Sequence, residues 1–223
     1  MTNQVAAEAF SDTTAGEAPV RGFIHRAESG AVGFVVLTHG AGGNSKAPLL
    51  VALAEQFTHA GYNALRCDLP FRQRRPSGPP SPSDAQRDQD GLRRAVTLMK
   101  EKFGGRAFLG GVSYGGRQAS MLVAERPALV EGLLLLSYPL HPPGRSAQLR
   151  TAHFPGLQTP VLFVSGTRDA FGTTEELQTA IKLIPARTKL VSIEAAAHGL
   201  MQKSNREELP RRIVEEFRSF VSA

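Results

Sequence analysis

The residues AFLGGVSYGG, at positions 107–116, decide the fold of this chain. The apolar run 107–110 predicts a strand, and residues 118–125 have the apolar spacing of a helix. Between them, Gly111 and Gly115 bracket a serine at a sharp strand-to-helix turn, where a side chain at either glycine would collide with neighbouring backbone. Such a nucleophile elbow exposes the serine hydroxyl. Because a chain with 22 glycines can also form this pattern in an ordinary glycine-rich loop, the elbow needs partners elsewhere in the sequence.

Length and composition are typical of one globular domain. The chain has 223 residues, of which 41% are hydrophobic and 21% charged, and no apolar run approaches the roughly 20 residues that span a bilayer. Residues 1–17 are polar and lack the basic start and apolar middle of a secretory signal. We therefore expect a flexible leader over 1–17, a single α/β domain over 18–223, and a cytoplasmic protein without a membrane partner.

The cysteine content and the charge bear on partners and cofactors. Cys67 is the only cysteine, so no internal disulfide can form, and its apolar surroundings favour a small buried residue over a catalytic thiol. The net charge of +6 could indicate nucleic acid, but the one basic concentration, Arg72, Arg74 and Arg75, lies in no recognisable nucleic-acid-binding module. We interpret it as a solvated or substrate-rim feature. The six histidines lack metal-ligand spacing, and we expect neither a metal nor another cofactor.

Short apolar runs alternate with amphipathic stretches, which predicts parallel βαβ units. The expected strands are 20–25 (an outer strand), 32–38, 62–67, 106–109, 132–138, 160–165 and 188–193, and the expected helices are 48–60, 84–102, 118–125, 173–184 and 206–221. Five prolines between Pro70 and Ser83 predict a long surface loop instead of a helix. The right-handed crossover rule winds these units into an open, mostly parallel sheet with helices on both faces.

Two later segments supply what a nucleophilic serine needs. A serine hydroxyl requires a base within hydrogen-bond reach and a third group that orients this base. Asp169 follows the predicted strand 160–165, and His198 follows 188–193, in the order that nucleophile-elbow enzymes use. Taken singly, Asp169 could cap the helix expected from residue 173, and His198 could be a loop histidine without a role. Together with Ser113 they form a predicted catalytic triad.

A second requirement is an oxyanion hole, whose backbone donors face the negative oxygen of the tetrahedral intermediate. The amide of Tyr114, directly after the serine, is the first expected donor. The second comes from HGAGG at 39–43, after the strand 32–38, and we expect the Ala41 amide, with Gly42 as the alternative. A phosphate-binding loop is the competing interpretation, but no Gly-Lys-Ser or Gly-Lys-Thr follows.

Four further residues are candidate substrate contacts. His39 begins the oxyanion loop, which it could brace without touching substrate. Phe71 and Arg72 lie in the proline-rich loop 70–83, and His141 follows a predicted strand end, where it could line the pocket or support it.

From about Val20 to the C-terminus, the chain resembles the α/β-hydrolase superfamily. The matching motifs are LTHGAG at 37–42, GGVSYGGR at 110–117, SYPLHPPG at 137–144 and GTRD at 166–169. Within the superfamily it resembles a small bacterial group of predicted hydrolases related to dienelactone hydrolases and to the vertebrate testis-expressed hydrolase-like proteins. The resemblance implies an α/β-hydrolase fold and a serine hydrolase. Val112 and Tyr114 depart from the basic residue and methionine common in the group, and Ser113 replaces the cysteine of dienelactone hydrolases, which argues against their manner of lactone opening.

The leading hypothesis is a carboxylesterase that forms an acyl-serine intermediate with a small soluble ester. Because residues 142–157 are too short for a large helical cap, we expect a minimal cap and a shallow, open pocket. Arginines 72, 74 and 75 would favour an acidic substrate if they rim it. A peptidase or thioesterase would use the same triad. The alternative of another class is a non-catalytic interaction module that docks through the loop 70–83.

Overall fold

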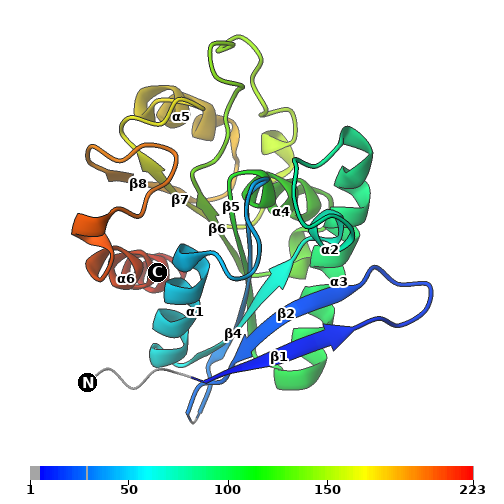
Figure 1. Ribbon diagram of the computed structural model, residues 1–223. Helices are drawn as coiled ribbons and strands as arrows, with labels where there is room; N and C mark the ends of the chain where they lie inside the picture. Colours follow the sequence, from blue (N-terminus) through cyan, green and yellow to red (C-terminus); the bar gives the residue numbers. More distant parts are fainter. Residues whose placement is uncertain (1–5, 29, 223) are drawn as a thin grey trace.

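The computed structural model describes residues 6–28 and 30–222 and is built on one eight-stranded sheet (Figure 1). The strand order across the sheet is β1-β2-β4-β3-β5-β6-β7-β8. The strands are β1 (Ala7–Asp12), β2 (Val20–His25), β3 (Gly33–Thr38), β4 (Tyr62–Asp68), β5 (Arg106–Val112), β6 (Gly132–Leu136), β7 (Val161–Gly166) and β8 (Thr188–Ile193). The helices are α1 (Pro48–His59), α2 (Pro70–Arg74), α3 (Ala85–Phe103), α4 (Tyr114–Glu125), α5 (Thr174–Ala180) and α6 (Glu208–Ser222). Single 3₁₀ turns are η1 (Pro82–Asp84), η2 (Pro127–Leu129), η3 (Phe154–Gly156), η4 (Ile181–Leu183) and η5 (Lys203–Asn205).

The direction of the strands determines where the loops meet. β1 and β2 pair antiparallel, as do β2 and β4, whereas the six strands from β4 to β8 across the sheet run parallel. The carboxyl ends of β3, β5, β6, β7 and β8 therefore lie along one edge of the sheet, which is where open parallel sheets place their ligands. This arrangement confirms the predicted α/β-hydrolase fold.

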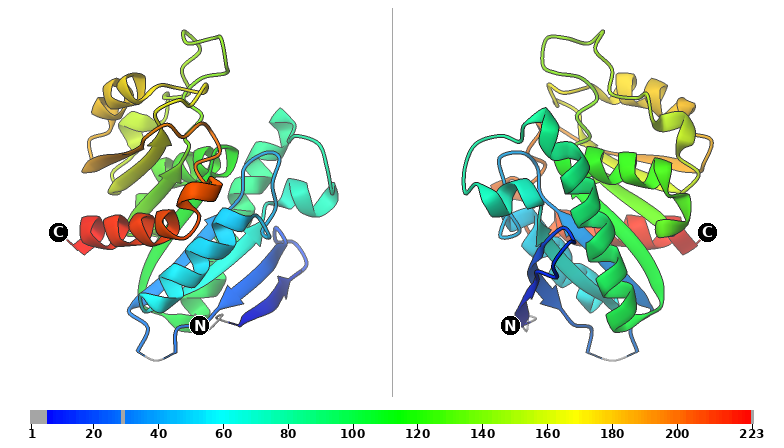
Figure 2. Two further views of the ribbon diagram at one scale, coloured as in Figure 1. Left: turned by 60° about the vertical axis from the view of Figure 1, so that its left-hand side comes forward. Right: turned by 90° about the vertical axis from the view of Figure 1, so that its right-hand side faces the viewer.

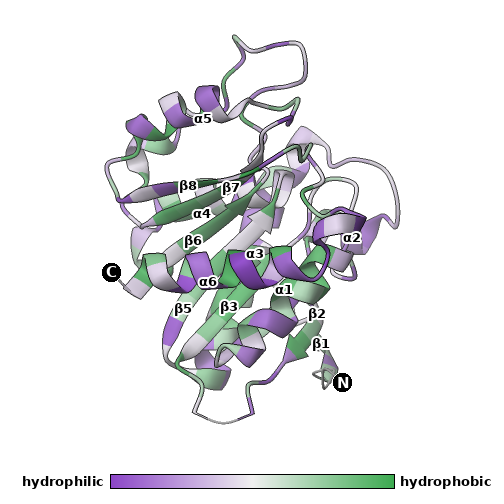
Figure 3. Ribbon diagram, turned by 90° about the vertical axis from the view of Figure 1, so that its left-hand side faces the viewer, coloured by the Kyte–Doolittle hydropathy of each residue, from purple (hydrophilic) through white to green (hydrophobic). Residues whose placement is uncertain are grey.

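Helices cover both faces of the sheet (Figure 2), and each layer of helices encloses one apolar core cluster. α1 and α6 pack on one face, and α3, α4 and α5 pack on the other. In the first layer, Phe217 of α6 meets Phe57 of α1 and Phe108 of β5 edge-on, with ring centroids 5.8 and 5.4 Å apart. Figure 3 colours most of the inner strands β6 and β7 as hydrophobic, in keeping with their burial by helices on both faces. None of the helices in residues 6–28 and 30–222 combines the length and apolar character needed to cross a membrane.

The N-terminal segment differs from the expectation of a flexible leader over 1–17. Residues 7–12 form β1, which pairs with β2 in the register Ala7 to His25 through Asp12 to Val20. The sequence of β1 is AEAFSD, and most of its side chains are exposed. The strand therefore has no alternation of apolar and polar residues by which it could be predicted. Main-chain hydrogen bonds and ion pairs such as Glu8 with Arg26 at 2.9 Å hold it. β2 is consequently not the outer strand that the sequence predicted; residues 1–5 of the leader lie outside the described residues.

The proline-rich segment 70–83 also contains a helix where only loop was expected. α2 spans Pro70–Arg74, with the proline at its first position, where the missing N–H is not needed. The amides of Arg72 and Gln73 both bond to the carbonyl of Leu69, and the amide of Arg75 bonds to that of Phe71. The helix ends after five residues. Residues 75–81 are irregular, as predicted, and Pro82 and Ser83 begin the 3₁₀ turn η1.

The buried imidazole of His25 on β2 makes the stability of the fold depend on pH. His25 is 1% exposed, and its Nε2 accepts a hydrogen bond of 2.8 Å from Nε of Arg66, while its Nδ1 has no partner in the described chain. Burial, with a smaller contribution from the Arg66 charge, lowers the pKa of His25 to about 4. The ring is therefore neutral at pH 7 and accepts at Nε2.

We expect the free energy of unfolding to fall as the pH is lowered from 6.5 to 4. In this window the unfolded chain protonates His25 and the folded protein does not, so the equilibrium shifts toward unfolding by up to about 3 kcal/mol. Urea titrations at pH 7, 5.5 and 4 measure the effect. His25→Gln keeps an acceptor for Arg66 without titrating, and should reduce the loss; equal pH slopes for both proteins would contradict this origin.

Candidate active site

The predicted elbow is present at the end of β5. Ser113 lies between Val112, the last residue of β5, and Tyr114, the first residue of α4, with φ at +50°. A side chain at Gly111 would place its Cβ 2.5 Å from the amide nitrogen of Gly116, and one at Gly115 would place its Cβ 2.3 Å from the carbonyl oxygen of residue 39. The two glycines therefore have the steric role that the sequence predicted, and the strained serine is held on the turn.

Ser113, His198 and Asp169 form one chain of hydrogen bonds. The serine Oγ lies 2.8 Å from Nε2 of His198, and Nδ1 of His198 lies 2.8 and 3.0 Å from the two carboxylate oxygens of Asp169. Because the carboxylate can only accept, Nδ1 carries the proton and Nε2 is left to accept from the serine. The ring of Phe171 lies beside the imidazole, with centroids 4.2 Å apart.

The local contacts of Asp169 exclude its alternative role as a helix cap. Thr173 caps α5, accepting from the amide of Glu176 in a capping box. The side chain of Asp169 is 1% exposed, and it accepts from the amide of Phe171 at 2.9 Å as well as from the imidazole. The backbone donor keeps this carboxylate pointing at His198.

Ser137 is a residue of the site that the sequence reasoning missed. It follows β6 with φ at +48°, and its Oγ donates a 2.7 Å hydrogen bond to the carbonyl of His198. Its amide bonds to the carbonyl of Val164 at 2.8 Å. A polar residue directly after the buried run LLLL at 133–136 was the available signal, since β6 lies between β5 and β7.

The glycine loop after β3 lies against the serine. A Cβ at Gly40 would be 3.3 Å from the Cβ of Ser113. His39 donates from Nδ1 to the carbonyl of Gly40 at 2.8 Å and accepts at Nε2 from the amide of Leu69 at 3.1 Å, and burial lowers its pKa. A neutral His39 thus braces the loop, as one of its two expected roles. In the described chain, no protein acceptor takes the amides of Ala41 and Tyr114.

Arg72 holds the same loop from behind and does not contact the cavity, contrary to the expectation of a substrate contact. Its Nε donates to the carbonyl of Gly43 at 2.9 Å, and its Nη2 donates to the carbonyls of Ala41 at 2.7 Å and Gly78 at 3.0 Å. Phe71, the other residue expected to contact substrate from this segment, does not line the cavity either. It is fully buried, with its ring centroid 5.7 Å from those of both His39 and Tyr114.

Three further expectations are corrected by contacts. His141 is buried outside the cavity: its Nδ1 bonds to the carbonyl of Pro142 at 2.9 Å and its Nε2 lies 3.3 Å from Glu176, contacts that raise its pKa. Arg74 and Arg75 both pair with Asp84, so they do not rim the site. Each of these side chains forms hydrogen bonds or ion pairs with residues outside the cavity.

The sole cysteine is a core residue, as predicted. Cys67 is buried on β4, and burial raises the pKa of its thiol to about 12. Among residues 6–28 and 30–222, no three histidine, cysteine or acidic side chains are grouped as metal ligands.

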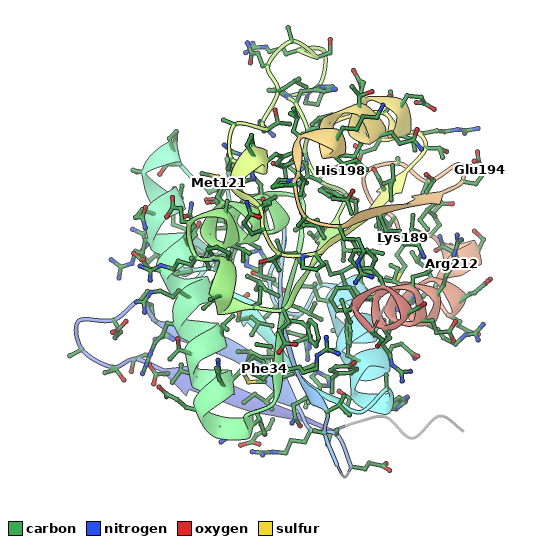
Figure 4. All side chains as sticks on the ribbon, turned by 180° about the vertical axis from the view of Figure 1, so that it is seen from behind. Phe34, Met121, Lys189, Glu194, His198 and Arg212 are labelled. Carbon is green, nitrogen blue, oxygen red and sulfur yellow. The ribbon has the colours of Figure 1, made fainter. Side chains whose placement is uncertain are left out.

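A cavity of about 1040 Å³ opens over Ser113 and His198. Residues 79–82 of the proline-rich segment form one of its walls, and most of its lining is apolar, including Leu49, Met121 and Met201. In Figure 4, the labelled His198 and Met121 lie toward one end of the molecule, and Phe34, near the start of β3, lies toward the other. The volume is at the upper end for small-molecule sites.

The α/β-hydrolase domain model matches residues 31–222, which is most of the chain. This chain belongs to the α/β-hydrolase family. Solved structures share the fold over nearly its whole length. A dienelactone hydrolase from Anabaena variabilis is 22% identical, with 98% of this chain and 99% of that chain covered and a TM-score of 0.76. Est1E from Butyrivibrio proteoclasticus is 17% identical (96% and 99% covered, TM-score 0.77), and an esterase from Pyrococcus furiosus is 17% identical (97% and 92%, TM-score 0.77).

In this α/β-hydrolase, Arg72 is expected to act as a positioning residue. Arg72→Met keeps the apolar stem but frees the carbonyls of Ala41 and Gly43, so the glycine loop 39–43 loses its fixed geometry. We expect kcat for hydrolysis to fall about 10- to 100-fold, with KM changed less than about 3-fold, because preorganised backbone donors act on the transition state. Steady-state kinetics measure the split. Arg74→Met, on the same helix, is the control, and equal kcat values for both variants would contradict the role.

Proposed function

We propose that this chain is a serine hydrolase that cleaves carboxylic esters through an acyl-serine intermediate. The observation that carries the proposal is the hydrogen-bond chain from Ser113 through His198 to Asp169, with 2.8 Å at each link. Its position supports the same conclusion, because it lies at the carboxyl ends of β5, β7 and β8, and Ser113 and His198 line the cavity. The single buried cysteine is in keeping with a cytoplasmic enzyme.

The geometry accounts for acylation. Nε2 of His198 takes the proton of the Ser113 hydroxyl as Oγ attacks the substrate carbonyl carbon, and the carbonyl oxygen becomes negative. The amides of Ala41 and Tyr114 are the proposed donors to that oxygen. Asp169 keeps the imidazole oriented and stabilises it while it is charged. When the tetrahedral intermediate collapses, the ester bond breaks and His198 returns the proton to the departing alkoxide.

Deacylation repeats these steps with water as the nucleophile. His198 takes one proton from the water, whose oxygen bonds to the acyl carbon, and the second tetrahedral intermediate expels the serine oxygen. His198 then reprotonates Ser113, and the carboxylic acid leaves. The reaction consumes one water and needs no other reactant.

There are two alternatives to an esterase: an enzyme with the same triad and another substrate, and a non-catalytic protein with the same fold. A thioesterase or peptidase would use the same groups, so only substrates separate these from an esterase. A non-catalytic module docking through residues 70–83 is less well supported, because the residues 79–82 line the cavity and Arg72, Arg74 and Arg75 are occupied by intramolecular contacts. These contacts favour a role of the segment in building the cavity.

The test combines a covalent probe with a substrate panel. A fluorophosphonate should label the folded protein once, at Ser113, as measured by intact mass and peptide mapping. p-Nitrophenyl esters, acyl thioesters and aminoacyl amides are then compared by kcat/KM, and we expect esters to be cleaved fastest. Labelling without ester cleavage would favour the thioesterase or peptidase alternative, and the absence of both labelling and turnover would favour the non-catalytic module.

A further inference from the structure

The fixed charges of the catalytic cavity are unbalanced. Arg117 and Arg150 both line it, and no aspartate or glutamate in the described chain does so. Neither guanidinium forms an ion pair among the described residues, although arginines elsewhere pair with Glu8, Glu131 and Asp84. Two cations facing an otherwise mostly apolar cavity require an explanation, because buried or half-buried charges are normally paired.

Arg117 is held in place by its main chain and leaves its side chain unpartnered. It lies in the first turn of α4, where its amide bonds to the carbonyl of Ser113 at 2.9 Å and its carbonyl accepts from Oγ of Ser120 at 2.9 Å. Its Nε is buried and has no acceptor among residues 6–28 and 30–222. A buried N–H of a charged group without a partner is costly, so an acceptor from a bound molecule would stabilise it.

Arg150 reaches the cavity from another segment of the chain. Its amide bonds to the carbonyl of Leu140 at 2.8 Å, and its carbonyl accepts from the hydroxyl of Tyr138 at 2.6 Å. Its guanidinium has one long hydrogen bond, from Nη1 to the carbonyl of Pro139 at 3.3 Å. The backbone of Arg150 is therefore anchored while most of its five side-chain donors remain available.

The two charges are close enough to affect one another and their neighbours. Burial and the Arg117 charge together lower the pKa of Arg150, and the same two causes lower the pKa of His153 to about 4. Burial raises the pKa of Tyr138, which stays protonated. Neither neighbouring side chain supplies a negative charge at neutral pH, so the positive charge around Arg117 is not compensated.

We propose that Arg117 and Arg150 bind a carboxylate on the substrate, so that the preferred substrate is an ester that carries a second, ionised carboxyl group. This inference rests on the proposed esterase function and specifies its substrate class. Forked guanidinium donors match the two oxygens of a planar carboxylate, and the apolar walls suit the hydrocarbon between that group and the ester. The acidic substrate that the sequence suggested through Arg72, Arg74 and Arg75 is thus supported by different arginines.

Matched substrate pairs separate charge from shape. Monomethyl adipate, compared with the methyl ester of its monoamide, places the carboxylate on the acyl side. 4-Acetoxybenzoate, compared with 4-acetoxybenzamide, places it on the leaving-group side. In at least one pair, we expect kcat/KM to be at least ten-fold higher for the carboxylate than for the amide. Amides that match or exceed the carboxylates in both pairs would overturn the proposal.

Variants tie the preference to the two arginines. Arg117→Gln and Arg150→Gln should each lower the carboxylate-to-amide ratio at least ten-fold, and Arg117→Lys should retain part of it. Arg145→Gln, an exposed arginine outside the cavity, is the matched control and should change neither rate. Arg150 lies outside helices, so its variant still tests the proposal if the change at Arg117 prevents folding. A preference that survives both glutamine substitutions would contradict it.

A binding experiment distinguishes failure of this inference from failure of the esterase function. Ser113→Ala protein is titrated calorimetrically with 4-acetoxybenzoate and monomethyl adipate, and with their amide counterparts. Arginine-dependent binding of a carboxylate, with no turnover of any ester by the unaltered protein, would refute the esterase and keep the anion site. Turnover of esters without any carboxylate preference would keep the esterase and refute the anion site.

Discussion

Replacing Ser113 with alanine is expected to lower kcat for ester hydrolysis about 10⁴-fold or more. The change removes the cavity-lining hydroxyl that lies 2.8 Å from Nε2 of His198, and the variant retains the proposed oxyanion donors and the cavity. The measurement is kcat on the best ester of the panel, with active-site titration to exclude contaminating esterase. Because acyl transfer cannot proceed on the alanine, burst-phase alcohol release should vanish as well.

A stability measurement is the control that separates this loss of activity from unfolding. Ser113 has φ at +50° and ψ at −115°, a conformation that costs a non-glycine residue about 1–3 kcal/mol. Ser113→Gly should therefore raise the free energy of unfolding by about 1–2 kcal/mol, whereas Ser113→Ala keeps the strain and should change it little. Urea denaturation compares the two. Residual activity above about 1% of the starting value in either folded variant would show that another group acts as nucleophile.

The parts of the site that could be predicted from the sequence are those on buried parallel strands. Continuous apolar runs such as 132–136 mark strands covered on both faces, and the crossover rule aligns their carboxyl ends. Given that edge, Ser113, Asp169 and His198 needed only to follow the correct strands to come together. The alternation of strands and helices is therefore sufficient to predict that these three residues lie together, and no side-chain contact has to be known.

The parts that could not be predicted depend on contacts without a local pattern. β1 is held by main-chain pairing with β2, and its side chains are mostly exposed. Its polar composition therefore predicted a flexible leader instead of a strand. Arg72 looks like a surface arginine in a proline-rich loop, yet three loop carbonyls converge on it in the fold. Arg117 ends the motif GGVSYGGR, in which the serine was the residue of interest. The lack of a partner for its Nε becomes evident only when its surroundings are known. Roles set by long-range packing left no signal in the neighbouring sequence.

Asp169→Asn is expected to lower kcat about 10³- to 10⁴-fold at neutral pH while leaving the fold intact. The substitution preserves size, and the asparagine oxygen can still accept from the amide of Phe171. Its NH₂ group, however, donates where the carboxylate accepted, and favours a His198 tautomer with the proton on Nε2. That nitrogen then donates toward Ser113 and cannot take the hydroxyl proton, and the imidazolium formed during attack loses its counter-charge.

The matched control for this variant is Glu176→Gln, another carboxylate-to-amide change beside a histidine. Glu176 faces His141 at 3.3 Å, outside the cavity, so the same change in chemistry should leave kcat within about 3-fold. Since KM reflects cavity contacts that neither variant alters, we expect the Asp169 effect in kcat and not in KM. A loss smaller than ten-fold in folded Asp169→Asn protein would mean that the tautomer of His198 is set by another group, and Asp169 would then be a structural partner of the loop containing Phe171.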